Sequence, residues 1–183
     1  MKHIKTLIFV AISSFLLATN CEKELNELPP ETTTGRHTFG CLVNGEIFLD
    51  SKSIIHWGRP NLWAEYSKNY NSLSISAMGK KNGKIASVEF TITNPVEMLP
   101  VKIDAAIYNA GCYVNNPDCP CPYFIGKNTG NVILTRFDTI NEIVSGRFYF
   151  DGICSDNNAN PISDSVGYVT EGRFDIKWMH IYE

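Results

Sequence analysis

Apolar and polar residues alternate along most of this chain from about residue 37 onward. Between Thr38 and Leu49 the apolar positions recur at every second residue, on either side of Asn44-Gly45. Asn-Gly between two alternating runs is the strongest short-range hairpin signal, because both residues tolerate the positive φ of a tight turn. The pattern therefore predicts a β-hairpin over residues 38–49.

A second hairpin is expected between residues 73 and 92. Leu73, Ile75 and Ala77 alternate with serines, and the segment 86–92 alternates apolar with polar residues in the same way. The glycine-bounded segment 79–83 (GKKNG) separates the two runs and is expected to form the turn.

Six further segments are typical of strands: 104–109, 122–126, 130–137, 143–151, 166–170 and 172–179. No segment keeps a helical period over four turns. Roughly nine or ten short strands predict an all-β fold, an antiparallel β-sandwich or barrel. The segments 110–121 and 152–165 interrupt the alternation with Pro, Asn and Cys, so long loops are expected there.

Glu171, Arg173 and Asp175 alternate from the residue before the last of these expected strands into that strand. Charges at every second position lie on one face of a strand. We interpret them as a solvated face with weak cross-strand pairs.

The beginning of the chain is typical of an export signal. A basic leader (Lys2 to Lys5) precedes an apolar stretch over 7–18, which is too short to span a bilayer with margin. Small or polar residues then lead to Cys21. A cysteine at this place can be acylated, so we expect lipid on Cys21 to hold the mature protein at a membrane. The alternatives are ordinary secretory cleavage nearby and an uncleaved anchor.

This junction resembles that of bacterial lipoproteins, in which the new N-terminal cysteine carries the lipid. Their usual box has Leu three residues before the cysteine and Gly or Ala directly before it, where this chain has Ala18 and Asn20. Lipoproteins of Bacteroides-like bacteria tolerate such departures. In them an acidic stretch such as Glu22-Lys23-Glu24 is similar to a signal for display on the cell surface. The resemblance implies a lipid-anchored protein of the outer membrane.

Three parts are expected: a signal peptide (1–20), a flexible or extended tether (21–36) and a single β domain (37–183). The tether is polar, with Pro29-Pro30 and three successive threonines, a composition that cannot build a core. Without the signal peptide the chain has 163 residues, with 14 basic against 19 acidic residues and a net charge of −5. This acidity, without any Lys/Arg-rich run, argues against a nucleic-acid partner.

Five further cysteines follow Cys21 in the sequence. Cys41 lies in an apolar strand pattern and is expected to be a small buried hydrophobic residue. The other four can form two disulfides in three pairings: Cys112, Cys119, Cys121 and Cys154. Export favours disulfides, although two cysteines separated by one residue cannot easily bridge each other. Free thiols and a four-thiolate metal site are the alternatives.

No catalytic or cofactor-binding motif is present in the sequence. It contains no Gly-x-Ser-x-Gly, no histidine pair at metal-ligand spacing and no glycine-rich phosphate loop. We therefore expect no cofactor and no enzymatic activity. An enzyme with a site assembled from distant residues is the alternative.

Aromatic residues are concentrated among polar ones in the segment 56–70 (HWGRPNLWAEYSKNY). They are Trp57, Trp63, Tyr66 and Tyr70. Exposed aromatic faces beside Arg, Asn and Glu suit sugar rings, and Trp and Tyr also anchor protein interfaces. We treat these four as a candidate ligand surface. The alternative is that they fill the core.

Two tripeptides are similar to the pattern at which Bacteroides-like bacteria O-glycosylate exported proteins. They are Asp138-Thr139-Ile140 and Asp164-Ser165-Val166. Thr139 and Ser165 are therefore candidate O-glycosylation sites, and this role requires that they be exposed.

The mature chain as a whole resembles small lipoproteins of Bacteroides-like bacteria. The likeness is carried by strand-and-turn segments at 38–48, 130–138, 145–150 and 170–175. It implies a shared fold and a place in the cell envelope, and it supplies no catalytic residue. We expect the β domain to bind a glycan or an envelope protein through its loops. The alternatives are a structural or assembly part of a surface complex and a hydrolase with a dispersed site.

Overall fold

The computed structural model describes residues 27–51, 60–81, 84–109, 121–156, 158–177 and 179–183. These residues form twelve strands and no helix. The strands are β1 (Thr38–Val43), β2 (Glu46–Leu49), β3 (Leu62–Ser67), β4 (Ser72–Lys81), β5 (Lys84–Thr93), β6 (Pro100–Lys102), β7 (Ala105–Asn109), β8 (Tyr123–Lys127), β9 (Asn131–Asp138), β10 (Ile143–Ser155), β11 (Pro161–Lys177) and β12 (His180–Tyr182).

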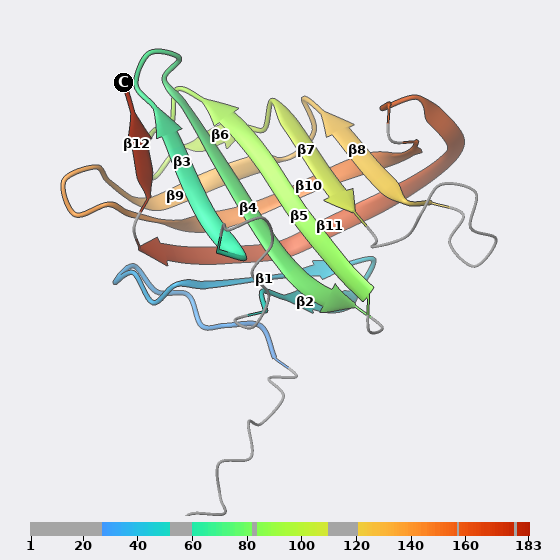
Figure 1. Cartoon of the computed structure of the whole chain (residues 1–183), viewed down its shortest axis with the longest axis horizontal. Coiled ribbons are helices and arrows are strands. Elements are labelled where there is room, and N and C mark those ends of the chain that lie inside the picture. The colour runs from blue at the N-terminus through green and yellow to red at the C-terminus, as the bar shows by residue number, and fades with distance from the viewer. Residues whose placement is uncertain (1–26, 52–59, 82–83, 110–120, 157, 178) are drawn as a thin grey trace, which may run out of the picture.

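All twelve strands belong to one large, mostly antiparallel sheet (Figure 1). Its order is β12-β3-β4-β5-β7-β8-β10-β11-β1-β2, and β9 pairs with both β10 and β6. Among the described strands only β12 and β3 pair in parallel. The sheet is open, because β12 and β2 stand at its two ends. The expected all-β, antiparallel character is confirmed, with more strands than expected and without closure into a barrel.

The core lies where the sheet folds over on itself. In Figure 1, β3, β4 and β5 cross in front of β9, β10 and β11, and buried side chains from both groups form one cluster. Phe90 of β5 lies 4.6 Å from Phe148 of β10 and 6.0 Å from Phe174 of β11, measured between ring centroids. Because successive side chains of a strand point to opposite faces, the other half of the side chains forms the outer face of the sheet.

The two expected hairpins are both present, but the second has a different turn. β1 pairs with β2 around Asn44 and Gly45, whose φ angles are 52° and 81°. β4 and β5 pair as far as Lys81 and Lys84, so the turn expected over 79–83 was placed too early. Gly79 lies within β4, where any side chain would collide with the carbonyl oxygen of Leu49.

The prediction of a long loop over 152–165 is wrong. β10 continues through Ser155 and β11 begins at Pro161, so the connection is a short hairpin turn. The Asp156 carboxylate closes this turn by accepting hydrogen bonds from the backbone N–H groups of Asn158 and Asn160. The sequence pattern also missed β3, β6 and β12, which are short or lie in aromatic segments.

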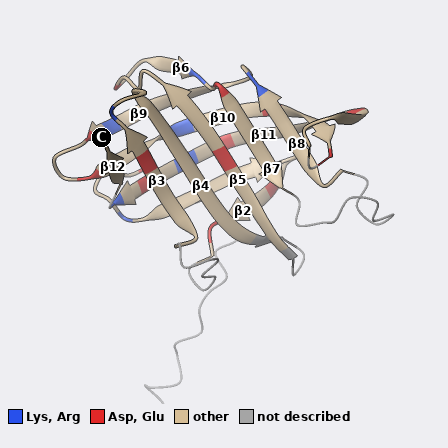
Figure 2. Ribbon diagram, turned by 45° about the horizontal axis from the view of Figure 1, so that its top comes forward, with Lys and Arg blue, Asp and Glu red and all other residues tan. Residues whose placement is uncertain are grey.

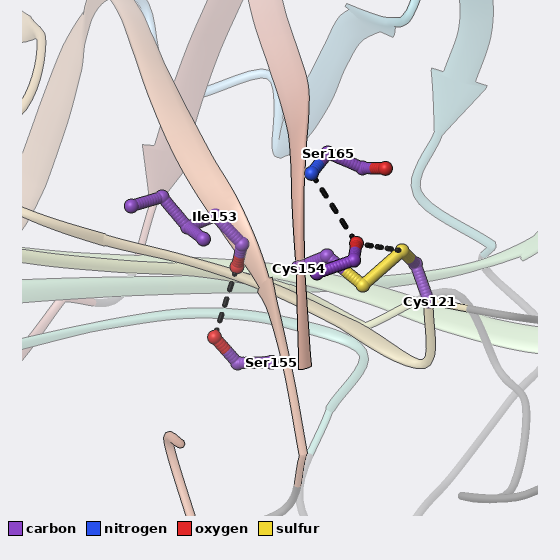
Figure 3. Close-up of a disulfide and its surroundings, with 6 residues drawn as sticks. Cys121, Ile153, Cys154, Ser155 and Ser165 are labelled. Atoms are coloured by element: carbon purple, nitrogen blue, oxygen red, sulfur yellow. Dashed lines mark hydrogen bonds between the residues drawn. A yellow bond between two sulfur atoms is a disulfide. The ribbon is translucent and has the colours of Figure 1, made fainter. Parts of the chain in front are cut away.

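Within the described residues, a disulfide between Cys121 and Cys154 joins the start of β8 to the end of β10 (Figure 3). Beside it, the Ser155 hydroxyl donates a hydrogen bond to the carbonyl of Ile153. The expectation of a disulfide among the four loop cysteines is confirmed for this pair, which leaves neither sulfur for a four-thiolate metal site. Cys112 and Cys119 lie outside the described residues. Cys41 is fully buried in the core, as expected.

Residues 29–36, which we call the strap, lie against the outer face of the sheet at β11 and β1. The strap is held by Asp175, whose side chain is opposite to the buried Phe174 and Ile176 on β11. The Asp175 carboxylate accepts hydrogen bonds from the Thr32 hydroxyl (2.6 Å) and from the backbone N–H groups of Thr34 (3.2 Å), Gly35 (2.8 Å) and Arg36 (3.0 Å). The strap also rests on Gly40, where a Cβ atom would lie 2.5 Å from the ring of Pro29.

The strap changes the picture of the expected tether. Residues 29–36 bend at Thr33-Thr34, and Gly35 has a φ of 75°. They are fastened to the domain that was expected to begin only at residue 37. The rest of the expected tether (21–26) and Cys21 lie outside the described residues.

Candidate functional site

A groove lies on the outer face of the sheet, beside the strap. Cross-strand pairing aligns Ile133 of β9, Arg147 of β10 and Arg173 of β11 in one row. The neighbouring row holds Asn131 and Tyr149, which are also paired. The groove has a volume of about 320 Å³ and is lined by Glu31, Asn131, Ile133, Arg147, Phe148, Tyr149, Glu171, Gly172 and Arg173.

The strap supplies one wall of this groove. The Glu31 carboxylate lies 2.7 Å from the Arg147 guanidinium. The Arg173 guanidinium approaches the carbonyl of Pro29 at 3.4 Å. The groove is therefore made by three strands and by the segment that leads toward the N-terminus.

Positive and negative charges balance within the groove. Arg147 pairs with Glu31, and Arg173 lies 3.8 Å from Glu171. Figure 2 shows that both basic and acidic residues occur along the strands of the sheet. The side chains of Arg147 and Glu31 are 62% and 43% exposed, and ion pairs at such sites contribute about 0–1 kcal/mol. A ligand can rearrange such a pair at little cost.

Tyr149 presents an aromatic surface at the groove. Its side chain is half exposed, and its hydroxyl accepts a 2.7 Å hydrogen bond from the Asn131 amide. This bond fixes the ring over the face of β9 and β10. The groove thus combines one aromatic ring and one aliphatic side chain with groups that donate and accept hydrogen bonds.

Glu171 reaches the groove from a β-bulge. β11 contains one extra residue relative to both β10 and β1 near this point, and Glu171 has a φ of 51°. A left-handed conformation costs a residue other than glycine about 1–2 kcal/mol. Bulges redirect side chains next to functional sites, and unfavourable backbone conformations collect there. The local conformation of Glu171 is therefore an independent indication of a site.

The four aromatic residues singled out from the sequence do not share one surface. Trp57 lies outside the described residues. Tyr66 packs against the core and against Phe137, at 5.0 Å between ring centroids. Trp63 instead lines a hollow of about 80 Å³ on the outer side of β3. Tyr70 is 80% exposed in the turn between β3 and β4. The hollow beside Trp63 is completed by Pro60, Glu65, His180 and Tyr182.

Thr139 and Ser165 are both exposed, as glycosylation at either residue requires. Thr139 follows Asp138, whose pKa is held well below its ordinary value by the Arg136 guanidinium and by hydrogen bonds from Asn141. Ser165 lies on β11 near the disulfide (Figure 3). Modification of either residue stays a prediction.

The groove was not predicted as a site from the sequence, and two of its residues, Glu171 and Arg173, were interpreted only as part of a solvated strand face. Arg147 and Tyr149 lie in an expected strand, where their alternation with buried phenylalanines indicates only that they face outward. Their neighbours Asn131 and Glu31 are far away in the sequence, and pairing between β9, β10 and the strap brings them together. The one local signal is Glu171-Gly172, which interrupts the alternation of β11.

Comparison with known proteins found no matching family model, no matching curated protein and no matching solved structure. In the described part of the chain, no helix is long and apolar enough to cross a membrane. Within the same residues, no group of three or more His, Cys, Asp or Glu side chains is placed to hold a metal ion.

Proposed function

We propose that this protein is a lipid-anchored, outer-membrane protein of the cell envelope that binds a neutral glycan in the groove beside the strap. The role is one of binding and not of catalysis. The observation that carries the proposal is the lining of the groove, where Tyr149 stands among charges that cancel in pairs.

Such a lining suits a sugar better than an ion. The C–H face of a sugar ring packs on an aromatic ring, and its hydroxyl groups both donate and accept hydrogen bonds. Arg147 and Arg173 offer donors, Glu31 and Glu171 offer acceptors, and Asn131 offers both. A charged ligand would have to displace a partner of opposite charge. The volume of the groove also lies at the lower end of the range of volumes found for small-molecule sites.

The folded-over sheet would act as a rigid, sandwich-like support for this groove. Its floor is formed by β10 and β11, which pair with each other over most of their length. A site built on such strands keeps its geometry better than a site on loops. The glycan site therefore lies on a sheet face, and not on the loops favoured by the sequence.

The anchor is tested by the intact mass of the mature protein from its native host, with palmitate labelling. We expect a diacylated or triacylated chain that begins at Cys21. The Cys21→Ala variant should lose the lipid. An unlipidated wild-type protein would show that the domain is secreted or periplasmic, and would remove the membrane from the proposal.

The glycan site is tested by screening the lipid-free domain on an array of neutral glycans, followed by calorimetry. Tyr149→Ala should weaken binding by about tenfold, because stacking on an aromatic ring contributes about 0.5–1.5 kcal/mol. Tyr70→Ala is the matched control, since Tyr70 is exposed and lies away from the groove. Equal loss in both variants would contradict the assignment of the site.

A second candidate function is assembly with another envelope protein. Four aliphatic residues form a continuous cross-strand row on the outer face, because Ile107 pairs with Ile125, Ile125 with Ile153, and Ile153 with Val166. Ile107, Ile153 and Val166 are exposed. Adjoining exposed apolar side chains favour a protein contact. Ile153→Lys should abolish cross-linking to a partner in the native envelope while leaving glycan binding unchanged.

A further inference from the structure

A second cavity lies beneath the strap, next to the groove. Its volume is about 160 Å³. The strap contributes Glu31, Thr32 and Thr33 to its lining, and the sheet contributes Thr135, Gly146, Arg147 and Phe174. We call this cavity the channel.

The channel is present because the strap is held on the sheet mainly by hydrogen bonds and not by packed apolar side chains. Asp175 holds the strap between Thr32 and Arg36, and the Arg136 guanidinium donates a hydrogen bond to the carbonyl of Thr33 (2.7 Å). Toward the N-terminus, Pro29 rests on Gly40. Between these fastenings the strap presents short threonine side chains, which do not fill the space above the sheet.

The channel and the groove meet at one ion pair. Glu31 and Arg147 line both spaces, and their charged groups lie 2.7 Å apart. Both side chains are long and largely exposed, so the pair can open without a change of the backbone. Once it opens, the groove and the channel can be occupied by one ligand.

The lining of the channel continues the chemistry of the groove. The hydroxyl groups of Thr33 and Thr135 can donate and accept hydrogen bonds, as the polar groups of the groove do. Glu31 and Arg147 are the only oppositely charged pair that lines both spaces, among the described residues. The charges of the lining residues therefore cancel in the groove and in the channel alike.

We infer that the groove and the channel form one elongated site, which takes a linear chain of neutral sugar units. One unit packs at Tyr149, the chain passes Glu31 and Arg147, and the next units lie beneath the strap. Glu31 thereby determines specificity for chain length. This inference rests on the proposed glycan-binding function and adds to it the form of the ligand.

The test compares chain lengths by calorimetry on the whole lipid-free domain. The probes are the disaccharide and the hexasaccharide of four linear series: α-1,4-glucan, β-1,4-glucan, β-1,4-mannan and β-1,4-xylan. In the series that binds, the hexasaccharide should bind at least tenfold more tightly than the disaccharide. Thr135→Phe, which fills the channel, should reduce this ratio to below threefold and leave the disaccharide affinity unchanged. Thr93→Phe, at an exposed position on β5, should keep the wild-type ratio.

Hydrogen exchange on the wild-type protein makes the test independent of whether Thr135→Phe folds. The hexasaccharide should slow exchange of the amides of residues 31–33 by at least threefold, and the disaccharide should not. Equal affinities for both lengths, with no added protection of the strap, would overturn the elongated site while the glycan-binding function stood. Binding of no series would overturn both.

Discussion

At the scale of single residues, Asp175 does the most to define the shape of the site. Its side chain is only 1% exposed, and it accepts hydrogen bonds from the strap and, at 2.7 Å, from the Ser145 hydroxyl. Burial by itself would raise the pKa of Asp175. The hydrogen bonds from Arg36, Thr32, Ser145 and Gly35 outweigh burial and hold the pKa below its ordinary value. The carboxylate is thus ionised when it binds the strap.

Replacing this carboxylate should destabilise the protein. Asp175→Asn keeps the shape of the side chain but puts an NH₂ group where an acceptor is needed, leaving buried donors without a partner. We expect the free energy of unfolding in urea to fall by about 2–4 kcal/mol. Asp151→Asn, at an exposed position on β10, should change it by less than about 0.5 kcal/mol. If both substitutions changed the free energy of unfolding equally little, the hydrogen bonds between the strap and Asp175 would contribute no stability.

The stability that Asp175 provides should depend on pH. Its folded-state pKa is lowered from 3.8, so its contribution is complete above the unfolded pKa and is lost as pH falls through the folded pKa. The difference in unfolding free energy between wild type and Asp175→Asn should therefore be constant from pH 7 to about 5 and shrink below about pH 4. Urea titrations of both proteins at pH 7, 5, 4 and 3 measure it. A difference that grows on acidification would contradict the assignment.

Asp175 supports both the stability of the protein and the shape of the site, whereas Glu171 serves the site at a cost in stability. Glycine adopts a positive φ without strain, so Glu171→Gly should raise the unfolding free energy by about 1 kcal/mol. The same change removes an acceptor from the groove and should weaken glycan binding. Glu89→Gly, in the interior of β5, should instead destabilise the protein by about 0.5–1 kcal/mol. A destabilised Glu171→Gly variant would mean that the bulge depends on the glutamate side chain.

At the scale of the elements, the sequence correctly predicted those features that neighbouring residues in the chain determine. Asn44-Gly45 sets its hairpin because the turn needs only the φ preferences of those two residues. The ends of β4 and β11 depend on neighbours elsewhere. Gly79 is a strand residue because β2 approaches it, and Glu171 does not end β11 because pairing on both sides carries the strand past the bulge. The alternation of apolar residues along one strand does not reveal which other strands lie beside it.

The candidate site was unpredictable for the same reason. Its lining comes from β9, β10, β11 and the strap, and their register places the side chains together. The polar composition of residues 29–36 correctly predicted that they would not enter the core. They are nevertheless ordered, because one buried carboxylate on β11 binds their backbone, and alternation alone predicted that Asp175 would be solvated.

The disulfide fastens an element pair near the outer aliphatic row. Cys121 and Cys154 are separated by 33 residues, and closing a loop of this length stabilises a protein by about 2–4 kcal/mol. The double variant Cys121→Ala/Cys154→Ala should lose stability within that range, measured by urea unfolding. An unchanged midpoint in the variant would show that β8 and β10 pair equally well without the bond.

At the scale of the whole molecule, the two ends of the described chain depend on each other. The hydrogen bond from Thr32 to Asp175 spans 143 residues, and β11 can receive the strap only after it has paired with β10 and β1. Such long-range contacts form late in folding, because the loops they close must first lose their entropy. We infer that the groove is completed last, on a core that does not require the strap.

This order predicts that residues 37–183 fold alone and that the strap and Asp175 act as one unit. The core cluster contains no strap residue, so the shortened chain should keep a cooperative urea transition, at lower stability than the mature chain. Removing the strap exposes Asp175 to water, and Asp175→Asn should then cost less than about 0.5 kcal/mol. The two changes should therefore be non-additive by about 2 kcal/mol in a double-mutant cycle. Additive losses would mean that Asp175 stabilises β10 through Ser145 independently of the strap, and that the groove wall is held by other contacts.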